Sequence, residues 1–183
     1  MATSLLSAEA RRRFVKLHSQ SMNVTNIRLA TTADLSEIAT LMHDSFVEYR
    51  NLYTEAAFLA TTPTAEKIAE RIMEGPVWFA EHEGAIIGTV SVVPRGDDLY
   101  IRGMAVLPQA RGLQLGQLLL KQVEEFARQR KYQRLVLSTT PFLLRAIRLY
   151  ERAGFQRADE GPRDLFGTPL LTMVKAVAAS ESA

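Results

Sequence analysis

The chain has 183 residues, 47% of them apolar, and a net charge of +2 at neutral pH. That size fits one domain with a substantial core, and the absence of cysteine excludes disulfides, thiolate metal sites and a cysteine nucleophile. The three histidines lie in different segments, so we expect no metal site. No apolar run reaches the roughly 18 residues of a membrane span and we find no secretory signal, so we predict a cytoplasmic protein with no membrane partner.

The excess of basic residues lies in a predicted N-terminal extension, residues 1–25. The extension has a charge of +3, from Arg11, Arg12, Arg13 and Lys16 against Glu9. The rest of the chain therefore sums to −1, and we expect no nucleic-acid partner. The extension also has the pattern of a short amphipathic helix that begins at Ser7.

The first half of the chain predicts two helices and four strands. Thr32 is typical of a helix N-cap, Pro63 precedes a second helix, and Gly75-Pro76 ends it. Glu83-Gly84 and residues 94–98 separate strand-like apolar runs, as hairpin turns do. We therefore predict strands at 26–30, 77–82, 85–93 and 99–106, and helices at 35–46 and 64–73.

The second half predicts β-α-β crossovers. Apolar residues recur at helical spacing from Leu115 to Phe126, behind a loop that contains Gly112 and Gly116. We expect a further helix from Thr140-Pro141 to Gly154, strands at 134–138, 155–158 and 169–175, and a tail at 177–183. This order predicts an α/β protein of the α+β type, with one domain at 26–176. Its core is a mixed, mostly antiparallel sheet of about seven strands with helices on both faces.

The junction between the fourth predicted strand and the following helix is a candidate anion site. The first N–H groups of a helix lack intrahelical partners and the helix dipole is positive there, so a phosphate is favoured. Arg111 adds a full charge to the same loop. Because the glycine loop follows the fourth strand instead of the first, it does not fit a dinucleotide-binding Rossmann unit.

Two motifs near this junction resemble those of the GCN5-related N-acetyltransferases, the GNAT family. The first is V-x-P-x-x-R-G-x-x-x-G, from Val106 to Gly116, and the second is A-x-x-L-Y-x-x-x-G-F, from Ala146 to Phe155. The resemblance implies the acyl-CoA N-acyltransferase fold and direct transfer of the acetyl group of acetyl-CoA to a primary amine acceptor. The alternative is a non-catalytic acyl-CoA sensor or a partner-binding domain of the same fold.

The resemblance also implies a place for each part of acetyl-CoA. The pantetheine arm pairs with the end of the fourth strand, and the pyrophosphate lies on the backbone amides of the loop. The corresponding residues are Met104, Ala105 and Val106 for the arm, and Arg111, Gly112, Leu113, Gln114, Leu115 and Gly116 for the pyrophosphate. Gln114 stands where a glycine is more usual, and it would be strained if that position requires a positive φ. Leu143 stands where an asparagine is frequent.

Tyr150 of the second motif is the candidate general acid. Leu143, Ala146 and Tyr150 share one face of the predicted helix, and in the resembling enzymes this tyrosine lies beside the thioester sulfur. A phenol is protonated at neutral pH and can donate to a departing thiolate. The candidates for the general base are Tyr100 acting through water, Asp98 and Glu48.

Two sets of residues bear on the acceptor. Asp44, Glu48, Tyr49 and Tyr53 suit a cationic amine, although the same pattern fits core aromatics beside solvated charges. Arg102 instead suits an acceptor that carries a carboxylate. The sequence also allows a homodimer, in which a second chain would pair with the strand edge after Pro169.

Overall fold

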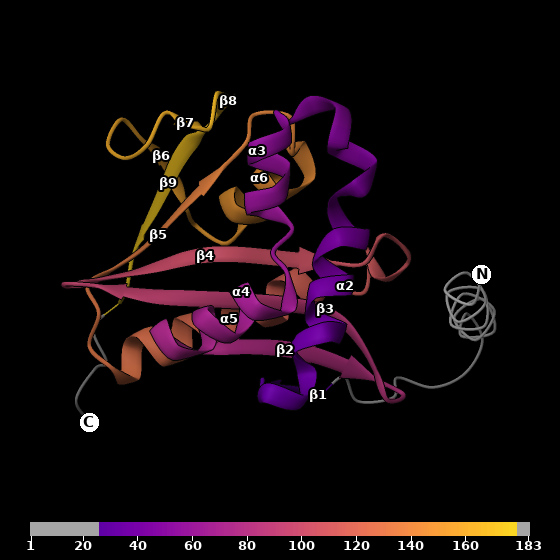
Figure 1. Cartoon of the computed structure of the whole chain (residues 1–183). Coiled ribbons are helices and arrows are strands. Elements are labelled where there is room, and N and C mark those ends of the chain that lie inside the picture. Colours follow the sequence, from indigo (N-terminus) through magenta and orange to yellow (C-terminus); the bar gives the residue numbers. More distant parts are fainter. Residues whose placement is uncertain (1–25, 179–183) are drawn as a thin grey trace, which may run out of the picture.

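The computed structural model describes residues 26–178, so the predicted extension at 1–25 and residues 179–183 of the predicted tail lie outside the described residues. A seven-stranded sheet forms the centre, in the order β1-β2-β3-β4-β5-β9-β6 (Figure 1). Every neighbouring pair is antiparallel except β4 and β5, so the predicted mixed, mostly antiparallel sheet is confirmed. The strands are β1 (Asn26–Leu29), β2 (Val77–His82), β3 (Ala85–Arg95), β4 (Asp98–Val106), β5 (Arg134–Thr139), β6 (Gln156–Ala158) and β9 (Leu171–Ala176).

Helices cover both faces of this sheet, as predicted. They are α2 (Leu35–Phe46), α3 (Glu55–Thr61), α4 (Ala65–Glu74), α5 (Leu115–Gln129) and α6 (Leu144–Arg152), with short 3-10 turns η2 (Thr32–Asp34), η3 (Val47–Leu52) and η4 (Pro108–Ala110). Adjacent Trp78 and Phe79 of β2 belong to different core clusters, because successive strand residues point to opposite faces. Trp78 packs with α5 and Phe79 packs with α2 and α4.

β4 carries one extra residue relative to β3. Residues 91–92 of β3 pair with Gly103 and Ile101, so Arg102 has no partner in the register. Such a bulge redirects the side chains that follow it. Ile101 belongs to the cluster under α5, whereas Ala105 belongs to the cluster under α2 and α4. Ile101 and Ala105, which would share one face of a regular strand, therefore point to opposite faces of the sheet.

β4 and β5 separate halfway along their length. They pair in parallel only from Asp98–Ile101 to Arg134–Leu137, and the rest of β5 pairs with β9 alone (Figure 1). Residues 102–106 of β4 keep β3 on one side and have no strand on the other. The sheet therefore opens into a cleft at the end of β4.

Two predicted elements are wrong in detail. The helix expected from Pro141 begins at Leu144, because residues 140–143 form a turn and Leu143, at the N-cap, has no side chain that can cap a helix. Leu143 therefore precedes the helix face that carries Ala146 and Tyr150.

The predicted last strand, 169–175, divides into two strands. Thr168–Pro169 forms β8, which pairs with β7 (Asp164–Leu165) in a separate hairpin, and β9 lies between β5 and β6. The edge strands of the sheet are β1 and β6, so the prediction of a free strand edge after Pro169 is wrong.

Across residues 26–178, none of the helices combines the length and the apolar character needed to cross a membrane. The cytoplasmic location stays a prediction.

Candidate active site

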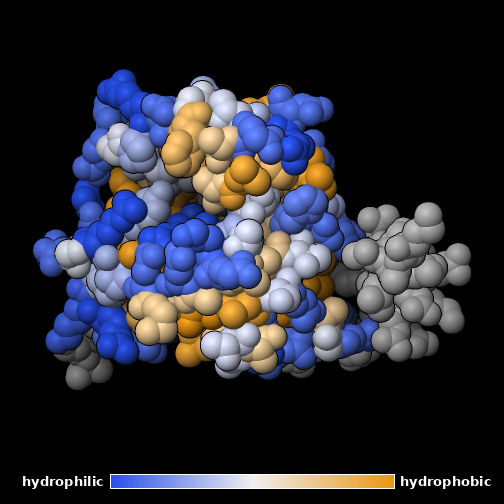
Figure 2. Space-filling model, in the orientation of Figure 1, coloured by the Kyte–Doolittle hydropathy of each residue, from blue (hydrophilic) through white to orange (hydrophobic). Residues whose placement is uncertain are grey.

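A cavity of about 870 Å³ occupies the cleft between β4 and β5. The ends of both strands line it, together with the loop before α5, the start of α6, and parts of α2, η3 and α4. In the space-filling view, a recess opens above the polar surface of α4 (Figure 2). The cavity therefore joins the predicted anion site to the predicted acceptor region.

The loop before α5 presents a cluster of free backbone donors. The N–H groups of Arg111 and Leu113 donate to the carbonyls of η4, at 3.3 and 3.4 Å. Those of Gly112, Gln114, Leu115 and Gly116 make no hydrogen bond within the described part of the chain. Four unpaired N–H groups at the start of a 15-residue helix form a site for a phosphate.

Gln114 adopts the conformation that suits glycine. Its φ of 59° and ψ of 14° lie in the left-handed region, where a Cβ is unfavourable. The position therefore has the positive φ at which a glutamine was expected to be strained. The N–H of Gln114 nevertheless stays unpaired, so the substitution does not remove a donor from the loop.

The end of β4 offers backbone groups to an extended ligand. The N–H of Leu107 donates to the carbonyl of Ile87 in β3 at 3.1 Å. Because backbone groups alternate in direction along a strand, the N–H groups of Val106 and Met104 point away from β3 and toward the cleft. The polyamide arm of a carrier can pair with this edge as a strand would.

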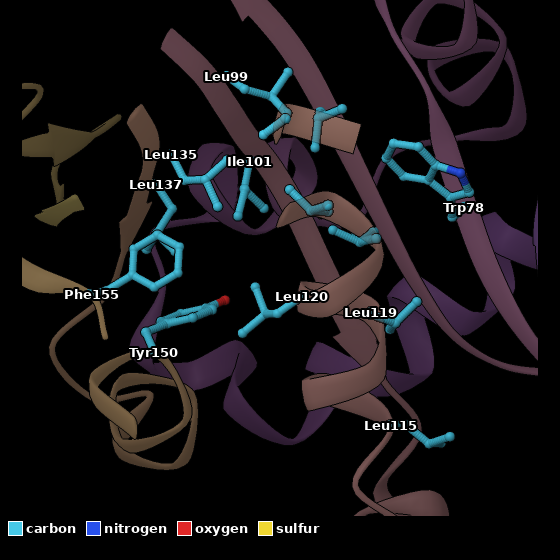
Figure 3. Packing of buried hydrophobic residues seen from close by; sticks show 14 of the residues in the cluster. Trp78, Leu99, Ile101, Leu115, Leu119, Leu120, Leu135, Leu137, Tyr150 and Phe155 are labelled. Atoms are coloured by element: carbon cyan, nitrogen blue, oxygen red, sulfur yellow. The ribbon is translucent and has the colours of Figure 1, made fainter. Parts of the chain in front are cut away.

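Tyr150 reaches the cavity from α6. The residue is buried, with 6% of its surface exposed, and its ring packs beside Phe155 at a centroid distance of 5.8 Å. Its hydroxyl points toward the space between Ile101 and Leu120 (Figure 3). Burial, and then the nearby phenols of Tyr53 and Tyr100, raise the pKa of Tyr150 above its ordinary value of 10. The side chain therefore stays a neutral proton donor at any physiological pH.

The structure brings some of the predicted acceptor and general-base residues to the cavity. Tyr49, Tyr53 and Arg102 of the acceptor set line it, as does Tyr100 of the general-base set. Burial raises the pKa of Tyr53, and the guanidinium of Arg95 covers the ring of Tyr100 at 3.8 Å.

Other predicted residues lie outside the cavity lining. Asp44 is exposed beside His43, and the carboxylate of Asp98 is held by two hydrogen bonds from Arg134. Glu48 forms an ion pair with Arg111. None of these three carboxylates lines the cavity.

Arg111 itself turns away from the free amides of its loop. Its guanidinium pairs with Glu48, donates to the carbonyl of Ser45 at 3.1 Å and lies 5.9 Å from the ring centroid of Tyr49. Arg111 thus ties the loop to α2 and η3. The anion site consists of backbone N–H groups more than of this side chain.

Sequence reasoning missed Arg71. Its guanidinium lines the cavity from α4 and donates to the carbonyl of Ala60 at 3.2 Å. Burial, followed by the charge of Arg102, lowers its pKa. A signal existed in the sequence, because Arg71 lies one helical turn after Ile68, which is buried on the inner face of α4.

A cleft with a free strand edge, an anion-binding helix start and a buried phenol suits acyl transfer from a phosphate-bearing carrier. The sequence model of the acetyltransferase (GNAT) family matches residues 37–155, and the chain belongs to this family. The uncharacterised N-acetyltransferase YjgM of Escherichia coli K12 is 29% identical over 140 residues, which cover 73% of this chain and 83% of that protein. With several other curated N-acetyltransferases, the chain spans less than half of the relative's own length.

Solved structures share the fold. The PaiA N-acetyltransferase of Thermoplasma acidophilum, in complex with coenzyme A, has a TM-score of 0.73 at 16% identity, over 84% of this chain and 99% of that chain. YncA of Salmonella typhimurium, solved with acetyl-CoA, has a TM-score of 0.65 at 22% identity, over 87% and 98% of the two chains. At these identities the likeness shows the fold alone. Together with the family match, it supports an acetyl-CoA-dependent N-acetyltransferase.

Proposed function

We propose that the protein transfers the acetyl group of acetyl-CoA directly to a primary amine, with Tyr150 as the general acid. The observation that carries this proposal is the buried phenol of Tyr150, which lines the same cavity as the free edge of β4. The acceptor is a small molecule, an amino acid or a peptide amine.

The residues around the cavity fit acetyl-CoA. The free N–H groups at Gly112, Gln114, Leu115 and Gly116 would hold its pyrophosphate, and the edge of β4 at 104–106 would pair with its pantetheine arm. Each step of this scheme uses protein groups and water.

In the proposed reaction, the amine nitrogen forms a bond to the acetyl carbonyl carbon while the bond from that carbon to sulfur breaks. The N–H groups of Met104 and Val106 face the cleft, where they can donate to the carbonyl oxygen as negative charge develops on it. Tyr150 then gives its proton to the departing thiolate and takes one back from solvent before the next turnover. The amine arrives as the free base and loses its second proton to solvent.

The general base is the remaining group to assign. Since the described cavity lining contains no Asp or Glu, we propose that the proton leaves through water beside Tyr100. Glu48 remains a candidate only if its ion pair with Arg111 opens.

Binding and turnover should be tested separately. Acetyl-CoA should raise the melting temperature, by the equivalent of about 2.7 kcal/mol at a concentration 100 times its Kd. The Gly112→Val variant should lose most of this shift, because Gly112 has φ +98° in the anion site. Gly96→Val is the matched control, since Gly96 also has a positive φ and open surroundings but lies in the turn between β3 and β4.

Turnover should then be followed as thiol release with a panel of amines, amino acids and peptides. We expect at least one acceptor to react and the Tyr150→Phe variant to react far more slowly. A protein that binds acetyl-CoA but acetylates no member of the panel would instead support the alternative function, a non-catalytic acyl-CoA sensor.

A further inference from the structure

The charged side chains that line the cavity are all arginines. They are Arg71, Arg102, Arg111, Arg145 and Arg152, and no Asp, Glu, Lys or His of the described residues lines it. This finding bears on the acceptor, because a polyamine or another strongly cationic amine would enter a cavity of its own charge sign. The carboxylates at Asp44 and Glu48, which favoured such an amine, lie outside the lining.

The arginines on the acceptor side differ in how their charge is balanced. Arg111 forms an ion pair with Glu48, and Arg102 forms one with Glu74 of α4. For Arg71, the described residues provide no carboxylate within ion-pair distance, and its one hydrogen bond goes to the carbonyl of Ala60. A guanidinium has five N–H donors and stays charged in proteins, so Arg71 retains donors and a charge to share with a ligand.

Arg71 is held close to the reacting end of β4. A Cβ added at Gly103 would lie 3.5 Å from Nη1 of Arg71 and 3.5 Å from Cε of Met42. Gly103 directly precedes the Met104–Val106 edge, and one strand residue spans only about 3.3 Å. A group bound by Arg71 is therefore within a few bonds of an amine positioned at that edge.

A second polar group lies on the same wall. Ser45 is on α2, one helical turn after Met42, and it lines the cavity. Its hydroxyl is buried and has no hydrogen-bond partner among the described residues. Buried polar groups are normally paired, so this unpaired hydroxyl is a second polar feature of the wall that the protein itself leaves without a partner.

We propose that the acceptor is a small amine that carries a carboxylate, as an amino acid does, and that Arg71 binds this carboxylate. The proposal rests on the proposed N-acetyltransferase function. The partly buried guanidinium of Arg71 forms charge-assisted hydrogen bonds to the carboxylate, which sets the acceptor amine beside the end of β4. Arg71 is thus a specificity-determining residue and takes no part in bond making.

The test compares matched acceptors. Thiol release from acetyl-CoA is measured with α-, β- and γ-amino acids and with the primary carboxamide of each, and kcat/KM is corrected for the fraction of free amine. For the amino acid whose spacing between amine and carboxylate fits the cavity, the kcat/KM of the wild type should be at least about tenfold higher for the carboxylate than for its carboxamide. Diamines without a carboxylate should react poorly.

Variants assign the preference to one side chain. Arg71→Gln should lower kcat/KM for the carboxylate at least about tenfold more than for its carboxamide, mainly through KM. Arg71→Lys keeps the charge without the planar fork and should retain part of the preference. Arg128→Gln is the matched control, because Arg128 lies on α5 outside the cavity and pairs with Glu125.

Three outcomes would overturn the inference. They are equal or faster turnover of carboxamides or diamines by the wild type, an unchanged preference in Arg71→Gln, and a wild type that is stabilised by acetyl-CoA yet acetylates none of the carboxylates. Turnover of carboxamides or diamines in the first case would leave the proposed function intact. A wild type that acetyl-CoA does not stabilise would contradict the proposed function itself.

Discussion

Gly116 lies so close to Leu149 that a Cβ at Gly116 would come within 2.6 Å of Cδ2 of Leu149. Gly116 lies at the start of α5, where the pyrophosphate is proposed to bind, and Leu149 precedes Tyr150 on α6. The start of α5 and the helix that carries Tyr150 therefore pack in direct contact through these two residues. A side chain at position 116 has to displace α6 or the Leu149 side chain.

We expect Gly116→Ala to destabilise the fold by at most about 1 kcal/mol, because the end of the Leu149 side chain has to move while alanine favours the helix more than glycine does. Leu149→Ala in the same chain should restore the space. The double variant should then be more stable than the sum of the two single effects predicts, by about 1 kcal/mol. Urea unfolding of the four proteins measures this coupling, and strictly additive effects would show that the two residues do not constrain each other.

Tyr150→Phe should lower kcat by about 100-fold or more while the thermal shift with acetyl-CoA stays close to that of the wild type. The reason is that phenylalanine fills the same buried space but has no proton for the thiolate. Because burial holds the pKa of Tyr150 above 10, the wild type should lose no activity through this group between pH 7 and pH 10. A pH profile of kcat with a descending limb near pH 9 that Tyr150→Phe abolishes would contradict this assignment of the phenol.

Gln114→Gly should leave acetyl-CoA binding intact and change the stability by less than about 1 kcal/mol. The relief of left-handed strain and the greater freedom of glycine in the unfolded chain oppose each other at similar magnitude. Gln114→Val, with a β-branched side chain at φ 59°, should lower both the melting temperature and the affinity. Calorimetric titration with acetyl-CoA compares the two variants, and equal affinities would mean that this backbone conformation is not needed for binding.

Glu48→Gln should keep kcat/KM within about fivefold of the wild type, because a partly exposed ion pair contributes at most about 1 kcal/mol. The side chain of Glu48 is 43% exposed and pairs with Arg111. A base would behave differently, since its removal costs about 100-fold or more. Steady-state kinetics at several pH values separates these outcomes, with the exposed Glu55→Gln as the control.

Asp34 should make stability depend on acid pH. Its carboxylate accepts hydrogen bonds from the Arg28 guanidinium at 2.9 and 3.1 Å and from the N–H of Thr31 at 2.8 Å. The bonds from Arg28, more than those from Thr31, lower its pKa to about 2. The unfolded chain binds the proton more tightly, so this contribution is complete above about pH 4 and is lost as the pH falls toward 2.

Asp34→Asn should therefore cost about 1–2 kcal/mol at pH 7 and less at pH 2. Urea unfolding at the two pH values measures the difference. A cost that does not depend on pH would mean that the carboxylate charge contributes nothing.

The sequence predicted α5 and the glycine loop before it because both depend on local rules. Helical spacing from Leu115 onward and the flanking glycines are properties of a short stretch of chain. The start of α6 was misplaced because the proline signal at Pro141 competed with a turn that ends at Leu143. The bulge at Arg102 was missed because it exists only relative to β3, and a single strand carries no sign of its register.

The acceptor side was the least predictable for the same reason. Asp44 and Glu48 are neighbours of cavity residues in sequence, yet helix geometry and the Arg111 ion pair keep them out of the lining. Arg71 comes from a helix with no motif and reaches the cavity through the packing of α4 against α2 and β3. The residues proposed to bind acetyl-CoA thus lie in local motifs, whereas the residue proposed to select the acceptor reaches the cavity through long-range packing.

The narrow pairing between β4 and β5 has a thermodynamic consequence. Strands β1–β4 and strands β5, β9 and β6 are hydrogen-bonded to one another through four residues of each strand only. The two parts of the domain are therefore held together mainly by the buried side chains under α5, and local separation at the end of β4 should cost less than global unfolding. Acetyl-CoA, by bonding to both sides, would make their unfolding more cooperative. Amide hydrogen exchange in β5 and β9 should slow on binding even at positions that the ligand does not touch.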